Sequence, residues 1–144
     1  MAIALDIGLM RLVISLVLGG LIGFERELHK SPAGLRTISL VSVGATLYTL
    51  ASLEFAGPNA DVSRIAAQIV VGLGFIGGGV IFQLRDTIHG LTTAASIWIA
   101  GAIGLMVGIG DYMFASATTL MVVLVLWLGV WEKKALTHNG AARK

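Results

Sequence analysis

Three stretches of sequence decide the fold: IAAQIVVGLGFIGGGVIFQL (Ile65–Leu84), LTTAASIWIAGAIGLMVGI (Leu91–Ile109) and YMFASATTLMVVLVLWLGVW (Tyr112–Trp131). None of them contains Asp, Glu, Lys or Arg. Each has about 20 residues, which is the length that a helix needs to cross a bilayer core about 30 Å thick. A helix also satisfies its own backbone hydrogen bonds in lipid. The three stretches therefore predict transmembrane helices.

Two further apolar segments precede them, at Ile7–Phe24 and Leu35–Leu53. The first begins after Asp6, without a basic start or a small-residue cleavage site, so we expect it to be retained rather than removed as a signal peptide. The sequence thus predicts an all-α membrane bundle of five transmembrane helices over residues 1–132. A short basic cytoplasmic tail is expected over residues 133–144.

The composition excludes most soluble classes of protein. Of the 144 residues, 56% are hydrophobic and only 12% are charged, against roughly 25% charged residues in soluble domains. So few charges could hardly cover the surface of a soluble enzyme, and the hydrophobicity excludes a disordered chain. The absence of cysteine excludes disulfides and thiolate metal sites.

The distribution of charge predicts the orientation. Five spans place the two termini on opposite sides of the membrane. With the tail in the cytoplasm, eight of the ten Lys and Arg residues lie inside, and only Arg11 and Arg64 lie outside. Because basic residues accumulate on the cytoplasmic side, we expect the N-terminus outside and the C-terminus inside.

Small residues four positions apart allow membrane helices to approach closely. The longest such series consists of Thr92, Ser96, Ala100, Gly104 and Gly108 in the fourth span. The third span contains Gly74 and Gly78 within a glycine-rich run, and the first contains Gly19 and Gly23. We therefore expect the third and fourth spans to form the packed centre. A local break in the third helix, with carbonyls exposed to a cavity, is the alternative reading of its glycines.

Charged residues near the inner ends of the first two spans suggest an ion pair. An Arg36 pair with Glu25 or Glu27 would hold the first helical hairpin together, and binding of an ion or a partner is the alternative. Arg26 can serve as one of the basic residues that keep the inner end of the first span on the cytoplasmic side. Ser31, followed by proline, is expected to begin the second helix.

The polar residues of the outer side allow similar alternatives. Asp61 is a candidate cap for the third helix and a local partner for Arg64. Gln68, one turn deeper on the same face, is a candidate to line a cavity. Thr93 can bond back to helix carbonyls. Arg11 can extend to the lipid headgroups or be neutralised by one of the outer carboxylates, which are Asp6, Glu54, Asp61 and Asp111.

No catalytic or cofactor-binding constellation is visible in the sequence. Glu25 and His29 are four residues apart, but two ligands do not define a metal site. No nucleophile is accompanied by a base, and no folded basic domain suggests nucleic-acid binding. We therefore expect no enzyme activity, no metal, no cofactor and no nucleic-acid partner; the expected surroundings are the lipid bilayer.

Five blocks in order carry a family resemblance: Gly20–Glu27 (GLIGFERE), Pro32–Thr37 (PAGLRT), Ser63–Gln68 (SRIAAQ), Gly72–Ile81 (GLGFIGGGVI) and Gly90–Ala95 (GLTTAA). Together they resemble the MgtC/SapB family of bacterial inner-membrane proteins. The resemblance implies a five-span domain with a cytoplasmic carboxyl end. It also implies functional roles for the positions that match the family's recurrent polar residues, namely Glu25, Arg26, Arg36, Asp61, Arg64, Gln68 and Thr93.

The family is linked to growth at low magnesium, survival inside host cells and restraint of the F-type ATP synthase. The resemblance thus implies a multi-pass inner-membrane protein that regulates a membrane partner or membrane energetics under magnesium limitation or acid stress. Longer members carry a soluble domain after the last span, and its functions are not carried over. We also expect a homo-oligomer, because five short helices bury little area. A small ion transporter or channel subunit, with a path lined by Gln68, is the alternative function.

Overall fold

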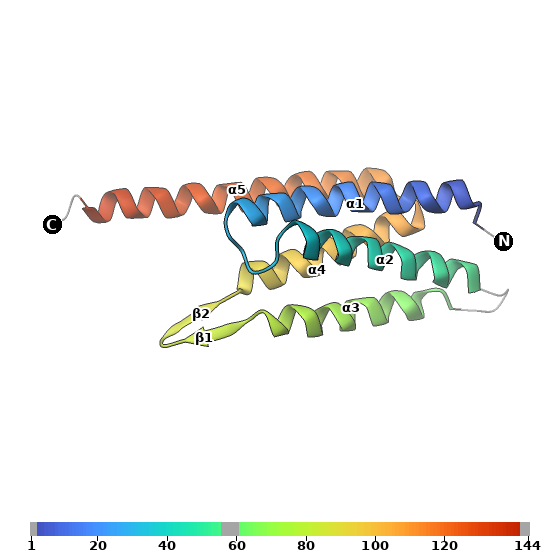
Figure 1. The fold of residues 1–144 in the computed structure, drawn as a ribbon, viewed down its shortest axis with the longest axis horizontal. Coiled ribbons are helices and arrows are strands. Elements are labelled where there is room, and N and C mark those ends of the chain that lie inside the picture. The colour runs from blue at the N-terminus through green and yellow to red at the C-terminus, as the bar shows by residue number, and fades with distance from the viewer. Residues whose placement is uncertain (1–2, 56–60, 142–144) are drawn as a thin grey trace.

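The computed structural model describes residues 3–55 and 61–141, which form five helices and one small hairpin. The helices are α1 (Leu5–Leu28), α2 (Leu35–Phe55), α3 (Ser63–Gly79), α4 (Leu91–Ile109) and α5 (Tyr112–Ala141), and the strands are β1 (Phe82–Leu84) and β2 (Thr87–His89). The helices lie alongside one another, and the start of α1 and the end of α5 lie at opposite ends (Figure 1). Four helices, α1, α2, α4 and α5, are long and apolar enough to cross a membrane. The predicted all-α membrane class is confirmed.

Two helices extend beyond their predicted ends. α1 continues from Leu5 to Leu28, so Glu25, Arg26 and Glu27 lie in its last turns rather than in a loop. α5 continues to Ala141, which makes most of the predicted tail helical; residues 142–144 lie outside the described residues. The predicted helix start at Ser31 is wrong, because α2 begins only at Leu35.

The third span differs most from the prediction. A helix was expected over Ile65–Leu84, but α3 ends at Gly79 and the chain turns into the antiparallel pair β1–β2. The helix is continuous through the earlier glycines, so the run of three at its end terminates it rather than breaking it, as expected from the low helix propensity of glycine. With 17 residues, α3 is about 25 Å long and lies at the short limit of a spanning helix.

The hairpin extends beyond the helices at one end of the bundle (Figure 1). Its tip carries Arg85 with a positive φ of 53°, and the rings of Phe82 and His89 stack with their centroids 5.4 Å apart. Gly90 has φ of 88°, and a Cβ there would overlap the carbonyl of Val80. Glycine at this position therefore lets α4 begin directly beside the end of α3.

The packed centre is formed by α1, α2 and α4, which corrects the expectation for α3 and α4. A Cβ at Gly104 of α4 would overlap the Ser42 carbonyl of α2, and one at Gly108 would lie 2.5 Å from Cβ of Thr49. From α1, a Cβ at Gly19 would lie 2.6 Å from Cβ of the same Ser42. Gly74 and Gly78 of α3 have no such neighbour in the described residues.

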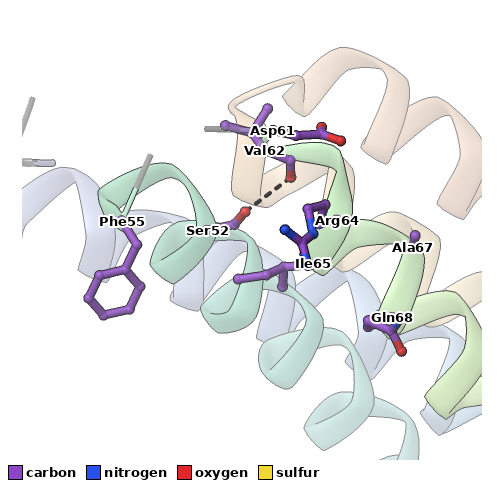
Figure 2. A pocket seen from close by; sticks show the side chains of 8 residues that line it. All are labelled: Ser52, Phe55, Asp61, Val62, Arg64, Ile65, Ala67 and Gln68. Carbon is purple, nitrogen blue, oxygen red and sulfur yellow. Dashed lines mark hydrogen bonds between the residues drawn. The ribbon is translucent and has the colours of Figure 1, made fainter. Parts of the chain in front are cut away.

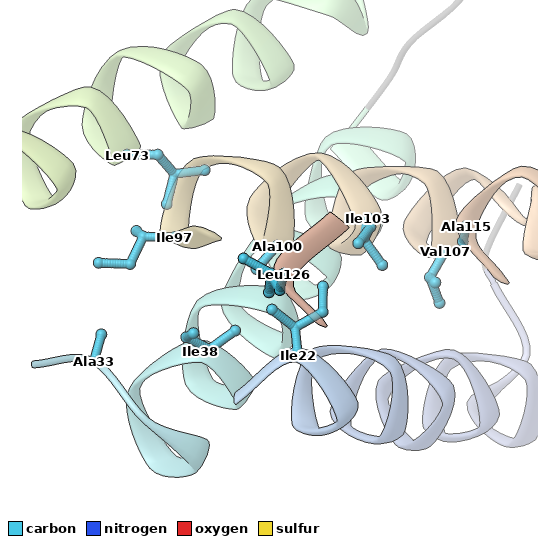
Figure 3. Close-up of a cluster of buried hydrophobic side chains, with 10 residues drawn as sticks. All are labelled: Ile22, Ala33, Ile38, Leu73, Ile97, Ala100, Ile103, Val107, Ala115 and Leu126. Carbon is cyan, nitrogen blue, oxygen red and sulfur yellow. The ribbon is translucent and has the colours of Figure 1, made fainter. Parts of the chain in front are cut away.

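Most of the buried apolar side chains also lie between α1, α2 and α4. Figure 3 shows Ile97, Ile103 and Val107 of α4 together with Ile22 of α1 and Ile38 of α2. Ser96 and Ala100, predicted to pack, are also buried on α4. Large apolar side chains on the outward faces of α1, α3 and α5 are exposed. A soluble protein would bury such side chains, so their exposure suits a bundle whose surroundings are hydrocarbon.

Candidate functional site

A buried charged cluster occupies the last turns of α1. Glu25 and Arg26 are only 3% and 8% exposed. Their side chains form a two-point ion pair, with Arg26 Nε 2.5 Å from Glu25 Oε2 and Arg26 Nη2 2.8 Å from Oε1. His29 Nδ1 lies 3.0 Å from Glu25 Oε1 and 2.9 Å from the Glu25 carbonyl oxygen. The Glu25 carboxylate is therefore held from two sides.

The loop that follows fixes the start of α2. Lys30 turns the chain with a positive φ of 53°. Glu27 Oε2 then accepts a hydrogen bond of 2.8 Å from the Leu35 backbone N–H, one of the N–H groups that a helix start leaves without a partner. The Ser31 and Thr93 hydroxyls are 2.8 Å apart, which ties this loop to the first turn of α4.

This arrangement corrects two predicted contacts. Arg36 is exposed, and among the described residues it pairs with neither Glu25 nor Glu27. Glu25 takes Arg26 instead, while Glu27 acts on the backbone of α2. Thr93 bonds to Ser31 through its side chain rather than to its own helix. The first hairpin is thus held by a carboxylate–amide hydrogen bond and not by the predicted ion pair.

A second polar cluster lies at the opposite end, where a cavity of 490 Å³ opens between α2 and α3 (Figure 2). Its polar lining residues are Ser52, Asp61, Arg64 and Gln68. Ser52 Oγ donates a hydrogen bond of 3.0 Å to the Val62 carbonyl, which joins the end of α2 to the start of α3. The neighbouring sequence Gly57-Pro58-Asn59 is typical of a turn, and it lies outside the described residues.

Asp61 organises the first turn of α3. Its Oδ1 accepts hydrogen bonds from the Ser63 hydroxyl at 2.6 Å and from the Ser63 backbone N–H at 2.9 Å. These bonds, the side-chain bond first, lower the pKa of the Asp61 carboxyl below its ordinary value. Asp61 therefore lies at the helix start, as expected, but the salt bridge expected with Arg64 is not formed. Arg64 and Gln68 are both exposed to the cavity.

One polar site was not identified from the sequence. Arg11 in α1 donates through Nη1 to the Gly108 carbonyl at 2.6 Å and through Nε to the Tyr112 hydroxyl at 3.2 Å. The Gly108 carbonyl belongs to the last turn of α4, where unsatisfied carbonyls attract cations. Arg11 thus joins α1, α4 and α5, rather than pairing with any of the outer carboxylates considered. The only available signal was an arginine within an apolar span.

These residues form two separate clusters rather than one site. Within residues 3–55 and 61–141, no three His, Asp or Glu side chains gather in a way that would hold a metal ion. The cluster of Glu25 and Arg26 is closed by mutual pairing, whereas the cavity beside Arg64 is open. The chemistry of the open cavity is that of binding, with a guanidinium, an amide, a carboxylate and a hydroxyl as its polar groups.

Comparison with known proteins gives consistent matches. The sequence profile of the MgtC family matches residues 12–134. "Protein MgtC" of Brucella abortus (strain 2308) is 43% identical over 109 residues, which are 76% of this chain and 45% of that protein. "Putative magnesium transporter YhiD" of Escherichia coli (strain K12) is 41% identical over 125 residues, which are 82% of this chain and 58% of that protein.

A third relative, "Protein MgtC" of Salmonella typhimurium, is 41% identical over 115 residues, covering 80% of this chain and 49% of the relative. The chain thus spans about half the length of the curated relatives it matches. No solved structure matches it significantly. The family profile covers α2, α3 and α4, most of α1 and α5, and both polar clusters. This chain is a multi-pass membrane protein of the MgtC family.

Proposed function

We propose that this protein is a non-enzymatic regulator of the bacterial inner (plasma) membrane, which binds a membrane protein partner under magnesium limitation or acid stress. The family and the relatives named MgtC support this proposal. The observation that carries it is the exposure of α3, in which only Leu73 and Gly77 are buried. An apolar helix with so little contact to its own bundle offers a surface for another transmembrane helix.

The exposed face of α3 has the chemistry that helix docking in membranes requires. Phe75 and Val71 are 86% and 67% exposed. Gly74 and Gly78 have open space where a side chain would lie, and small residues at this spacing let a second backbone approach closely. The small residues of α4 cannot serve a partner, because α2 already covers Gly104 and Gly108.

The partner proposed from the family resemblance is the F-type ATP synthase, and a second copy of this chain is a further candidate. A photo-crosslinking amino acid at Phe75 should capture the partner in native membranes grown at low magnesium. The matched control is the same substitution at Val125, an exposed position of α5. A distinct crosslinked membrane protein at 75 alone is expected, and a crosslinked dimer would identify a homo-oligomer. Equal patterns at both positions would contradict the proposed contact face.

An ion transporter or channel subunit is the second candidate function. The printed name of the Escherichia coli relative suggests magnesium transport for that protein, and here the Gln68 amide borders two cavities beside α3. Purified protein in liposomes distinguishes the two functions. Magnesium flux that Gln68→Leu abolishes would support the transporter and contradict the regulator, whereas liposomes without flux would favour the regulator.

The proposed orientation, with the N-terminus outside, can be tested in whole cells. Val62 and Lys30 are both exposed and lie at opposite ends of the bundle. The wild-type chain has no cysteine that would react. A single cysteine at Val62 should therefore react with a membrane-impermeant thiol reagent, and one at Lys30 should react only after the cells are opened. The reverse pattern would invert the topology.

A further inference from the structure

A long groove of 670 Å³ separates α2 from α3. Most of its lining is apolar and includes Leu40 of α2 and Ile69 and Ile76 of α3. Gly44 on α2 and Gly72 on α3 also line it, and neither has another atom within 4 Å of the position a Cβ would take. The groove is therefore an unfilled space between two helices, which a hydrogen bond from Ser52 to the Val62 carbonyl joins at one end.

The groove joins the polar cavity at its outer end. Ile65 and Gln68 line both spaces, so the polar cavity with Arg64 and Ser52 adjoins the apolar groove at these two side chains. From Ile65 to Ile76 a helix rises about 16 Å, which is close to one leaflet of a hydrocarbon core about 30 Å thick. A polar end joined to an apolar length of one leaflet is complementary to a lipid with a head group and an acyl chain.

The charge at the polar end selects the head group. Arg64 has no carboxylate within 4 Å in the described part of the chain, because the neighbouring Asp61 is engaged by Ser63. Figure 2 shows the Arg64 guanidinium on the side of α3 that faces α2, while the Asp61 carboxylate points away from it. A guanidinium binds a phosphate through two parallel hydrogen bonds.

We propose that the groove between α2 and α3 binds a phospholipid of the surrounding membrane. One acyl chain lies between Gly44 and Gly72, and the phosphate lies on Arg64. Gln68 is placed to donate a hydrogen bond to the oxygens between the phosphate and the chain. This lipid site is on the α2 side of α3, and it requires no protein partner, so it can be tested independently of the proposed regulatory function.

Filling the groove is the sharpest test. Gly44→Leu and Gly72→Leu place a side chain in the groove, and the new Cβ at each position meets no described atom within 4 Å. Gly74→Leu is the matched control, because its position is equally open but does not line the groove. Each variant, purified as the full chain in detergent and mixed with phosphatidylglycerol, is examined by native mass spectrometry. We expect the first two variants to lose the bound lipid and the control to keep it.

A second variant tests the phosphate contact without touching the groove. Arg64 is exposed, so Arg64→Gln should leave folding unchanged. It should weaken binding of phosphatidylglycerol about tenfold, the usual consequence of losing a charge-assisted hydrogen bond. Binding of diacylglycerol, which has the same chains and no phosphate, should be weak in the wild type and unchanged in the variant.

Three results would overturn the proposal. Equal lipid retention in Gly44→Leu, Gly72→Leu and Gly74→Leu would exclude the groove as the binding site. Loss of self-association in the filled variants, with lipid retention intact, would show that a helix of a second copy occupies the groove. Wild-type affinity for diacylglycerol as high as for phosphatidylglycerol would remove the role of Arg64.

Discussion

Replacing Gly104 with alanine should force α2 away from α4 and destabilise the protein. The new Cβ would overlap the backbone carbonyl of Ser42 and lie 3.0 Å from Cβ of Ala45. A backbone carbonyl cannot rotate aside as the end of a side chain can, so the two helices must separate. Overpacking of this kind costs about 1–3 kcal/mol.

Separation would also weaken an interhelical hydrogen bond. Thr46 Oγ1 donates to the Gly104 carbonyl at 2.7 Å, and such bonds between membrane helices contribute on the order of 0.6–1.7 kcal/mol. Alanine recovers about 1 kcal/mol of helix propensity relative to glycine. The net expectation for Gly104→Ala is therefore a loss of about 1–3 kcal/mol in the free energy of unfolding.

The matched control is Gly78→Ala, the same chemical change on α3. A Cβ at Gly78 meets nothing within 4 Å, so only the propensity term of about 1 kcal/mol remains, and it is favourable. Reversible unfolding of both variants in detergent micelles, followed by circular dichroism, measures the difference. If the two substitutions changed the free energy of unfolding equally, the close contact of α2 with α4 at Gly104 would be refuted.

Three further predictions concern the polar residues. Arg11→Met should lower the free energy of unfolding by about 2 kcal/mol, because it removes a charged hydrogen bond to a helix end. Tyr112→Phe should lower it by less than about 1 kcal/mol. Equal losses in the two variants would contradict the assignment of the Gly108 carbonyl as the main acceptor. Glu25→Gln should lower the free energy of unfolding by about 3–5 kcal/mol, because it leaves the Arg26 charge buried without its counter-ion. Replacing both residues with well-packed apolar ones should recover most of that loss. No recovery in the double variant would argue against the ion pair. The lowered pKa of Asp61 means that its contribution to stability is complete above the ordinary carboxyl pKa and is lost as the pH falls through the lower folded value. The protection of the first-turn amides of α3, measured as their exchange rate relative to the intrinsic rate at the same pH, should therefore fall at acid pH in the wild type and stay constant in Asp61→Asn.

Helix boundaries were predictable where apolar runs meet residues with special backbone geometry. The apolar run Leu91–Ile109 predicts the fourth span, and its ends are the bounds of α4. Gly90 and Gly110, with φ of 88° and 96°, flank the helix on both sides, and glycine adopts this region without strain. The end of α3 was missed because the apolar run continues past Gly79 into the hairpin, where hydropathy alone does not distinguish helix from strand.

The packing partner of α4 was not predictable from small residues counted on each span alone. The stripe that ends in Gly104 and Gly108 does pack closely, but its partner is α2. The face of α2 that receives it consists of Ser42, Thr46 and Thr49, all buried. Their spacing of three and four residues was a usable signal, since small polar side chains also form interfaces between membrane helices. The glycines of α3 predicted a close contact of α3 with α4 instead.

The candidate site shows the limit more clearly, because the partner of a charge in a membrane need not be another charge. The sequence suggested lipid headgroups or a carboxylate as partners for Arg11, yet the acceptor is a backbone carbonyl that every residue possesses. What distinguishes Gly108 is its place in the last turn of α4, where the carbonyls lack intrahelical partners. Glycine at position 110 leaves room for the guanidinium, since a Cβ there would lie 3.0 Å from Arg11 Nη2. Only the arrangement of α1 beside the end of α4 turns this common group into a specific binding partner, and that arrangement is a property of the fold.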